Sequence, residues 1–372
     1  MSRAISSRIT NSRTNGGESA PFGHTQGLDS GEELSGRDTS HQTRTNRRGM
    51  TMLRTHFVAA ARLLLFALLF GTPTGSAAAT TEKALFIYWR GETPCEKGLK
   101  DGLKAAGLNL EITEFDAAQN KQRLEHFIET QDERSFKFVY TFGTTATQVV
   151  AQRFHKTPIL FGIVASPVKA KIIDSWDSPG KNVTGISHTF PAKGQVDFIL
   201  RLATVRRVGM IYNPAEENAR IAYEEVSAAV HERGVELVTA PLKPGGSPEA
   251  AVEALLAQKI DFVYLPSDSL VISQSKQILP ALTKKRVPTY GAVEELVKNG
   301  AIIGIVANYY TVGKGLAKMA QAVLSGTAPA DIPASRLPLA MQTVLINRKT
   351  LRELGLKLPE EIVASGTFVG QN

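Results

Sequence analysis

The sequence lacks most of the motifs on which catalysis and cofactor binding depend. Its one cysteine, Cys95, cannot form a disulfide within the chain, and its histidines have no metal-binding spacing such as HExxH. The glycine-rich loops that bind nucleotides, GxGxxG and GxxxxGKS/T, are absent. Gly185 to Thr189 lacks the second glycine of a hydrolase nucleophile elbow. We therefore expect a protein that is not an enzyme and that has no cofactor and no metal.

Charge of one sign is not in strong excess either. The formal net charge is +8, but residues 1–50 contain seven arginines and five acidic residues, and residues 51–80 add two arginines. The remainder carries 34 basic and 30 acidic residues, so its net charge is about +4. Without blocks of lysine and arginine, this balance does not indicate nucleic-acid binding.

The first fifty residues contain almost no apolar run. They are rich in Ser, Thr, Arg, Gly and Asn, a composition that cannot bury enough surface to order itself. We interpret residues 1–50 as a disordered leader that precedes the true start of translation, at Met50 or Met52.

Residues 51–79 have the pattern of a secretory signal. Arginines precede the apolar run Leu63 to Phe70, and small residues follow it up to a cleavage site near Ala79. The run is too short to span a bilayer comfortably, although a permanent anchor or a twin-arginine signal at Arg47 and Arg48 are alternatives. Because no cysteine follows the signal, we expect a soluble periplasmic protein without a lipid anchor.

The stretch Phe138 to Ser166 organises the rest of the chain. It reads as a strand, a helix and a second strand, and both strands are apolar on both faces, as in a parallel sheet covered by helices. The first turn, Gly143 to Thr145, places small hydroxyl side chains and free N–H groups at a helix N-terminus, which attracts anions. The alternative is that Thr144 or Thr145 only caps the helix.

This unit occurs twice. Ile87 lies 51 residues before Phe138, and Ile211 lies 51 residues before Phe262, each within a similar strand. The pattern of strand, polar turn, helix, basic residue, proline and strand recurs with them. The repetition predicts two similar α/β lobes in tandem.

The first strand of the exported part ends in a polar turn that contains Trp89, Arg90 and Glu92. Such turns bind ligands in open α/β sheets. An indole can lie against a flat ligand, a guanidinium can hold a carboxylate, and Glu92 can accept from an amine or hydroxyl. The alternative is an Arg90–Glu92 pair on a solvated rim with Trp89 packed beneath it.

Three further expectations concern structure. Pro167 and Val168 predict the start of a short helix, Asn182 to Ser187 an extended crossing into the second lobe, and Ala328 to Pro338 a linker. Cys95, directly after Pro94 in the first helix, is expected to be packed and unreactive.

A series of short motifs, in order along the chain, resembles a known family. They are Gly143 to Ala146, Thr157 to Ile159, Asn182 to Gly185, Tyr212 to Pro214 with Glu216 and Asn218, Pro266 to Ser269, Asn308 to Tyr310, Gly326 to Pro333, Asn347, and Leu354 to Pro359. From about Lys83 to Pro359 the chain is similar to the exported substrate-binding proteins of ABC transporters, in the family that includes the tryptophan- and tyrosine-binding components.

The resemblance implies the type I periplasmic binding protein fold, with two Rossmann-like lobes of parallel sheet joined by a hinge of several strands. We expect lobe one to comprise residues 83–184 and 307–327, and lobe two residues 185–306 and 340–372. The ligand is expected in the cleft, on the turns that follow the strands. The candidate ligand-binding residues, from the turn of the first strand and from the resemblance, are Trp89, Arg90, Glu92, Thr144, Thr145, Ser166, Asn213, Ser267, Asp268, Ser269 and Asn308.

The chain departs from the amino-acid-binding pattern at three positions. Ser166, Ser269 and Asn308 stand where those relatives commonly have Asp, Asn and Asp. Losing carboxylates removes partners for an α-amino group, although Glu92 or Asp268 could replace them.

The leading hypothesis is an uptake receptor. It would capture a small carboxylate-bearing, amino-acid-like molecule as a monomer, close around it and deliver it to an ABC transporter permease. The alternative within this fold is a periplasmic sensor that docks on a membrane histidine kinase or chemoreceptor. A DNA-binding repressor of similar architecture is disfavoured by the export signal and by the lack of an N-terminal helix-turn-helix.

Overall fold

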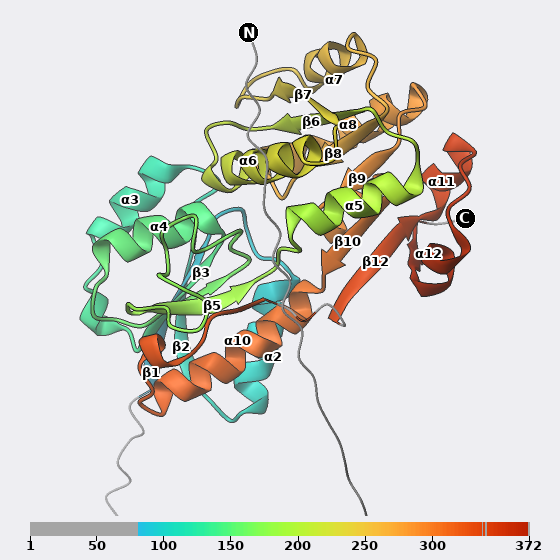
Figure 1. Cartoon of the computed structure of the whole chain (residues 1–372). Coiled ribbons are helices and arrows are strands. Elements are labelled where there is room, and N and C mark those ends of the chain that lie inside the picture. Colours follow the sequence, from blue (N-terminus) through green and yellow to red (C-terminus); the bar gives the residue numbers. More distant parts are fainter. Residues whose placement is uncertain (1–80, 337, 339–340, 371–372) are drawn as a thin grey trace, which may run out of the picture. The chain divides into compact units, whose positions relative to one another are not determined.

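The computed structural model describes residues 81–336, 338 and 341–370, all within one compact unit, Ser76–Asn372 (Figure 1). The predicted leader, signal and cleavage site lie outside the described residues. Within the described ranges, the helices are all too short or too polar to cross a membrane.

The unit contains two parallel-sheet α/β lobes. The sheet of lobe one has six strands in the order β11-β5-β4-β3-β1-β2, all of them parallel. Its strands and the helices that follow them are β1 (Glu82–Tyr88), α2 (Pro94–Ala105), β2 (Leu110–Asp116), α3 (Lys121–Glu129), the 3₁₀ helix η1 (Glu133–Ser135), β3 (Phe138–Phe142), α4 (Thr144–Arg153), β4 (Ile159–Gly162) and β5 (Val183–Ser187).

The sheet of lobe two has seven strands in the order β13-β12-β10-β9-β8-β6-β7, and only the β10–β12 pair is antiparallel. Its first elements are α5 (Ala192–Leu202), β6 (Arg207–Tyr212), α6 (Glu217–His231), β7 (Glu236–Pro241), α7 (Pro248–Leu256), β8 (Phe262–Leu265), α8 (Ser269–Lys284), β9 (Thr289–Gly291), α9 (Glu294–Lys298) and β10 (Ile303–Ala307). The elements that follow β10 belong to both lobes. Those of lobe one are α10 (Tyr309–Leu324), η2 (Pro329–Asp331) and β11 (Ser335–Arg336), and those of lobe two are β12 (Gln342–Asn347), α11 (Arg348–Leu354), α12 (Glu360–Ser365) and β13 (Thr367–Val369).

The tandem repeat expected from the sequence is confirmed down to strand register. The order β4-β3-β1-β2 in lobe one recurs as β9-β8-β6-β7 in lobe two. Ala84 is opposite Phe138 in the first sheet, and Val208 is opposite Phe262 in the second. The two sets of strands are therefore built to one plan.

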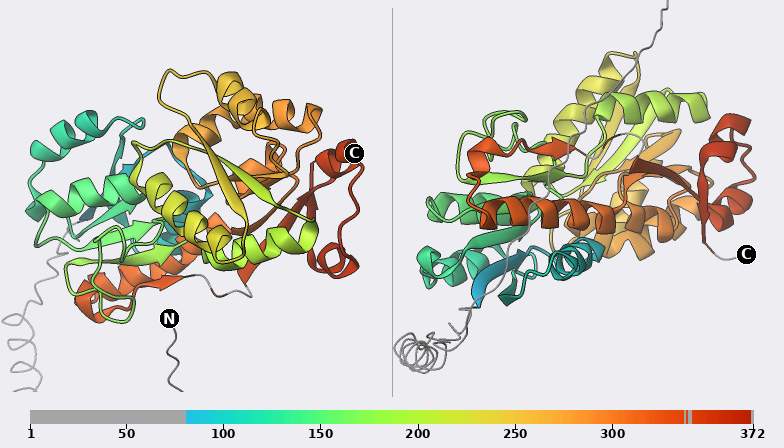
Figure 2. Two further views of the ribbon diagram at one scale, coloured as in Figure 1. Left: turned by 45° about the horizontal axis from the view of Figure 1, so that its top comes forward. Right: turned by 90° about the horizontal axis from the view of Figure 1, so that it is seen from below.

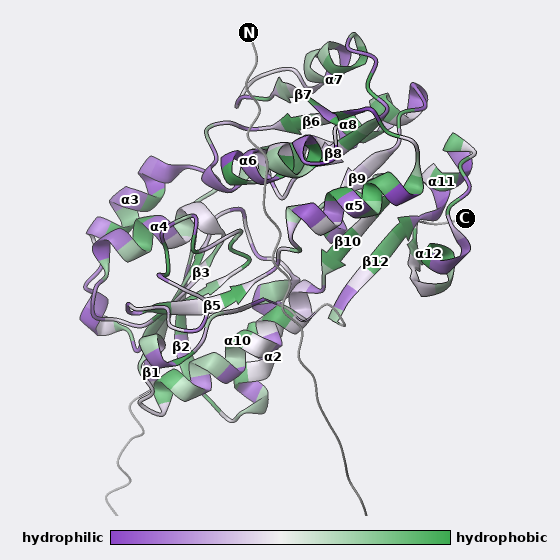
Figure 3. Cartoon of the chain, in the orientation of Figure 1, coloured by the Kyte–Doolittle hydropathy of each residue, from purple (hydrophilic) through white to green (hydrophobic). Residues whose placement is uncertain are grey.

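Apolar strands explain why both sheets are covered by helices. All residues of β3 and β8 are buried, and Figure 3 shows hydrophobic colouring on β5, β6 and β10 with hydrophilic colouring on outward helix faces. A strand that is apolar on both faces needs a layer on each face, as parallel α/β sheets provide. Cys95 is buried in this core, as expected from the sequence.

Helix α10 follows a strand of lobe two but packs on lobe one. Figures 1 and 2 show it (orange) beside α2 (cyan), and it also contacts β4 and β5. The two helices approach so closely that a Cβ on Gly313 would lie 1.9 Å from the Cys95 carbonyl oxygen, and one on Gly98 would lie 2.1 Å from that of Tyr310. The tail helices α11 and α12 (red) lie beside the second sheet.

Three local predictions are wrong. Asn182 to Ser187 is not a crossing, because β5 pairs with β4 inside the first sheet. Pro167 and Val168 begin a hydrogen-bonded turn instead of a helix, in which the amide of Ala170 donates to the carbonyl of Ser166. The expected linker contains η2 and β11, and β11 adds an edge strand to the first sheet.

Candidate ligand-binding cleft

The turns at the carboxyl ends of the strands converge on one small cavity. Lobe one contributes the exits of β1, β3, β4 and β5, and lobe two contributes the exits of β6, β8 and β10. The residues that line it are Trp89, Arg90, Phe142, Gly143, Thr144, Ile163, Ala165, His188, Glu216, Asn218, Ser267, Ser269, Ile272 and Tyr309. This is where open parallel α/β sheets bind ligands.

The N-terminus of α4 reaches the cavity without a cap. Its N-cap residue, Gly143, has φ of +89° and makes no side-chain cap hydrogen bond. The hydroxyl of Thr144 does not cap the helix, because it accepts a hydrogen bond of 3.3 Å from the amide of Ala165. Since neither threonine caps the helix, the capping alternative is wrong. The first N–H groups of α4 thus offer a positive dipole end at the cavity wall.

Two buried ring nitrogens of the cavity wall lack hydrogen-bond partners. Trp89 is 8% exposed and His188 is 5% exposed, and neither Trp89 Nε1 nor His188 Nδ1 has a partner. The other ring nitrogen of His188 lies 3.0 Å from the hydroxyl of Ser267. Buried polar atoms are nearly always paired, so two unpaired ones around one cavity indicate a place for a polar ligand.

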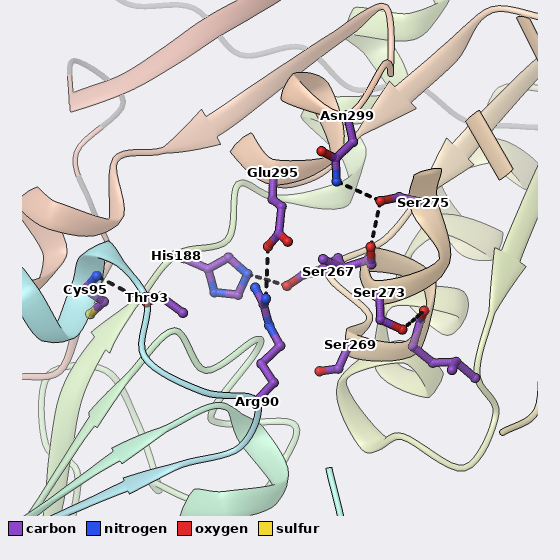
Figure 4. A network of polar contacts seen from close by, with 12 residues as sticks. Arg90, Thr93, Cys95, His188, Ser267, Ser269, Ser273, Ser275, Glu295 and Asn299 are labelled. Carbon is purple, nitrogen blue, oxygen red and sulfur yellow. Dashed lines mark hydrogen bonds and ion pairs between the residues drawn. The ribbon is translucent and has the colours of Figure 1, made fainter. Parts of the chain in front are cut away.

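Arg90 lies at the edge of the cavity and reaches across to the other lobe. Its Nη1 donates to Glu295 Oε2 at 2.9 Å, and Figure 4 shows the two side chains pointing toward each other. The guanidinium also lies over the ring of Phe142, 5.6 Å from its centroid. The alternative pairing of Arg90 with Glu92 does not occur, because Glu92 pairs with Lys100 on α2.

The wall from lobe two is a network built on two carboxylates. Asp268 is the N-cap of α8, where it accepts from the amide of Val271, and it also accepts from the amide of Asn213 at 2.5 Å. Glu216 accepts from the amide and the hydroxyl of Ser269 at 3.0 and 2.7 Å. These bonds join the turn after β6 to the turn after β8.

Burial shifts the pKa values of two groups at this site in opposite directions. Burial, helped by the positive charge of Arg90, lowers the pKa of His188 to about 3, so the imidazole is neutral. Burial, followed by the charge of Glu216, raises the pKa of Asp268, although backbone N–H donors oppose the shift.

Five of the eleven predicted site residues meet in the cavity, namely Trp89, Arg90, Thr144, Ser267 and Ser269. Ser166 lines an adjoining hollow that shares His188 and Ser267 with the cavity.

The other five predicted residues do not line the cavity, and these are Glu92, Thr145, Asn213, Asp268 and Asn308. Asn213 and Asp268 are buried behind its wall, whereas Asn308 is exposed and caps α10. The prediction missed His188, Glu216 and Tyr309. All three lie just after strands, so their position along the chain was the available signal.

The cavity is nearly closed in this structure. Its free space is about 20 Å³, room for about one water molecule. Contacts between the lobes hold it shut: besides the Arg90–Glu295 pair, the hydroxyl of Ser166 donates to Glu225 at 2.9 Å and Lys169 pairs with the same carboxylate at 3.0 Å. A larger ligand needs the lobes to separate.

A larger hollow of about 670 Å³ lies on lobe two between α8, α9 and α11. Several lysines and an arginine line it, but none of the unpaired buried side-chain atoms of the described residues belongs to it. The candidate site is therefore identified by its unpaired groups and strand ends, and not by volume. No cluster of three or more His, Cys, Asp or Glu suited to a metal occurs among the residues that the structure describes.

Two tandem α/β lobes with a cleft at their strand ends define the type I periplasmic binding protein class. Residues 86–369 match the family described as ABC transporter substrate binding protein, and the chain belongs to this family. The family is a class of binding proteins without enzymatic activity, it binds small molecules, and its members typically work outside the cytoplasm.

Individual relatives agree with this assignment. A tyrosine-binding protein of Clostridioides difficile is 26% identical over 264 residues, which cover 70% of this chain and 74% of the relative. The crystal structure of a conserved domain protein from Vibrio cholerae is 28% identical, with a TM-score of 0.71 over 78% of this chain and 100% of the other. The structure of an ABC domain in complex with L-Trp from Streptococcus pneumonia has the same TM-score and coverage at 23% identity.

Proposed function

We propose that the protein captures a small carboxylate-bearing, amino-acid-like molecule in the cleft and delivers it to an ABC transporter. The observation that carries the proposal is the uncapped N-terminus of α4 beside two buried, unpaired ring nitrogens. An N–H-rich helix end, an indole N–H and the guanidinium of Arg90 are donors suited to one carboxylate. The tyrosine- and tryptophan-binding relatives support a ligand of amino-acid type.

Binding operates in this proposal by closure of the lobes. The ligand would bridge the exit turns of both sheets, and the closed form would be recognised by a membrane permease. We place the hinge where the chain passes between the sheets, after Ser187, after Ala307 and after Arg336. The first of these lies three residues beyond the boundary expected from the sequence, because Gly185 to Ser187 pair within the first sheet.

We further propose where the protein acts and with what. The protein acts in the periplasm as a monomer without catalytic activity, and its partners are the ligand and the permease. The proposed ligand contacts are the predicted residues that line the cavity, with His188, Glu216 and Tyr309 in addition.

Thermal unfolding of the purified protein against amino acids, small carboxylates, nucleosides and sugars tests the proposal. A ligand at one hundred times its dissociation constant adds about 2.7 kcal/mol to the free energy of unfolding, which raises the midpoint measurably. We expect Thr144→Ala and Arg90→Ala to weaken the shift. Thr113→Ala and Arg153→Ala, both exposed and away from the cavity, are matched controls. If no compound shifts the midpoint and none is released on denaturation, solute capture is refuted and docking on a membrane sensor becomes the better explanation.

A further inference from the structure

The lobe-two wall of the cavity contains two buried carboxylates side by side. Glu216 is 5% exposed and Asp268 is fully buried. Each binds the turn of the other: Asp268 accepts from the amide of Asn213, and Glu216 accepts from the amide and hydroxyl of Ser269. Their charges interact directly, since the charge of Glu216 contributes to the raised pKa of Asp268.

Neither carboxylate forms an ion pair with Lys, Arg or His in the described part of the chain. The titratable groups nearby are either paired with another residue or neutral. Arg90 pairs with Glu295. His188 is neutral, and its Nε2 lies 3.0 Å from the hydroxyl of Ser267. Tyr309, which also lines the cavity, is a neutral phenol because burial raises its pKa.

The next acidic residue along the chain, Glu217, does form an ion pair. Glu217 begins α6 and pairs with Arg220 at 2.7 Å on the solvent side of the helix. Glu216 instead turns inward and lines the cavity.

Burying two like charges without a cation is costly, and the raised pKa of Asp268 means that this carboxyl keeps its proton more readily than an exposed one. The cost is removed when a cation arrives. Because Glu216 lines the cavity and Asp268 lies behind it, the open side of this pair faces the space that a ligand would fill.

We propose that Glu216, backed by Asp268, receives a cationic nitrogen of the ligand, and that its arrival releases to solvent the proton that Asp268 holds in the empty cleft. The inference rests on the proposed function, and it adds the residue that selects for an amine and a coupling of binding to pH. It assigns opposite walls to the two ends of an amino acid: the carboxylate to α4 of lobe one, the ammonium to lobe two. Each lobe then contributes one half of the charge recognition.

The direction of the pH effect follows from linkage. With the pKa of Asp268 raised, protons bind the empty cleft more tightly than the occupied one, so acid competes with the ligand. We expect affinity to fall as pH drops from 8 to 5.5, by at most about tenfold per pH unit where one proton is released. A free amino acid keeps its ammonium and its carboxylate charged throughout this range. His188 stays neutral because its pKa is lowered to about 3.

The first experiment compares each amino acid of the panel with the same carboxylate lacking the amine, such as L-tyrosine with 3-(4-hydroxyphenyl)propionate and L-tryptophan with 3-indolepropionate. We expect the amine-bearing member alone to raise the unfolding midpoint. In Glu216→Gln we expect the ratio between the dissociation constants of the two members of a pair to fall at least tenfold. In Glu217→Gln we expect this ratio to stay unchanged. Equal shifts from both members of a pair, or a shift only from uncharged compounds, would overturn the inference while solute capture stands. No shift from any compound refutes the proposed function itself.

The second experiment counts protons on the wild-type protein and does not depend on any variant folding. Titration calorimetry with the binding amino acid is run at pH 6.5 in phosphate and in ACES, two buffers that titrate near this pH and differ in ionisation heat. We expect the two measured binding heats to differ by the difference between the ionisation heats of the buffers, multiplied by up to one proton for each ligand bound. Identical heats in the two buffers, with binding intact, would show that no proton leaves and would overturn the coupling.

Discussion

His188 is the residue whose environment constrains its chemistry most tightly. It is 5% exposed, lies edge-on to Tyr309 at 5.8 Å between ring centroids, and uses one nitrogen on Ser267. The folded state excludes its charged form, since burial holds its pKa near 3. An imidazole that stays neutral over the physiological range can orient a ligand by hydrogen bonding without adding charge to the cleft.

This environment predicts a loss of stability in acid. The pKa of His188 is about 3 when folded and 6.5 when unfolded, so its contribution is complete above pH 6.5 and is lost as pH falls toward 3. Between pH 7 and 5 the wild type should lose about 2 kcal/mol more than His188→Gln, by urea unfolding. His231→Gln, exposed at the end of α6, should behave as wild type. An equal loss in wild type and His188→Gln would mean that the imidazole is charged in the fold.

The position of a residue along the sequence predicts part of the candidate site, but it does not predict which side chains interact with each other. Trp89, Arg90 and Thr144 were found because they follow strands, and the edge of a parallel sheet gathers such residues. Glu295, the partner of Arg90, is 205 residues away along the chain. The sequence around Arg90 does not show that it pairs with Glu295 instead of the nearby Glu92. Asp268 likewise has the right position, but its use as an N-cap turns it away from the cavity.

At the scale of elements, the contact between α2 and α10 fixes lobe one. Gly98 and Gly313 let the two backbones approach closely. Beside them, the hydroxyl of Tyr310 donates a hydrogen bond of 3.0 Å to Asp101 Oδ2. A side chain at either glycine meets main-chain carbonyl groups, which cannot move aside as a side-chain tip can.

Gly313→Ala is therefore expected to lower the free energy of unfolding by about 1–3 kcal/mol, because its Cβ would lie 1.9 Å from the Cys95 carbonyl oxygen. Gly315→Ala, two residues along the same helix, is the control: its Cβ would meet only a terminal methyl of Ile186. Thermal unfolding of both variants measures the difference. Equal midpoints would show that the helices can separate without cost.

The longer strands and helices are predictable from the sequence, whereas the shortest edge strands are not. The apolar strands and helices of both lobes follow from periodicity and from the recurrence of the FVY unit. The edge strands β11 and β13 have two and three residues, too few for a pattern. The sequence predicts a crossing at β5 because only its neighbours in space, β4 and β11, make it part of a sheet.

At the scale of the whole described unit, the contacts between lobes determine how readily the cleft closes. Three charged or hydroxyl side chains of lobe one, those of Arg90, Ser166 and Lys169, reach two carboxylates of lobe two, Glu225 and Glu295. Both carboxylates are partly exposed, so water screens these contacts and each favours closure modestly.

Removing one such contact should weaken capture without abolishing it. We expect Glu295→Gln to raise the dissociation constant about two- to fivefold by favouring the open form. Small-angle scattering should then show a larger radius of gyration without ligand. Glu294→Gln, which removes a pair with Lys298 within the same helix, should change neither quantity. Tighter binding by Glu295→Gln would instead indicate that Glu295 competes with the ligand for Arg90.

The return of α10 to lobe one also sets the order of events during biosynthesis. The strands from β1 to β5 leave the ribosome long before Tyr309 to Leu324, and until then α2, β4 and β5 lack the helix that covers them. Lobe one cannot complete its core before β10 of lobe two has been made. The nascent chain thus stays incompletely folded through most of its synthesis, and a truncation anywhere before Leu324 should yield a fragment prone to aggregation instead of a free-standing lobe.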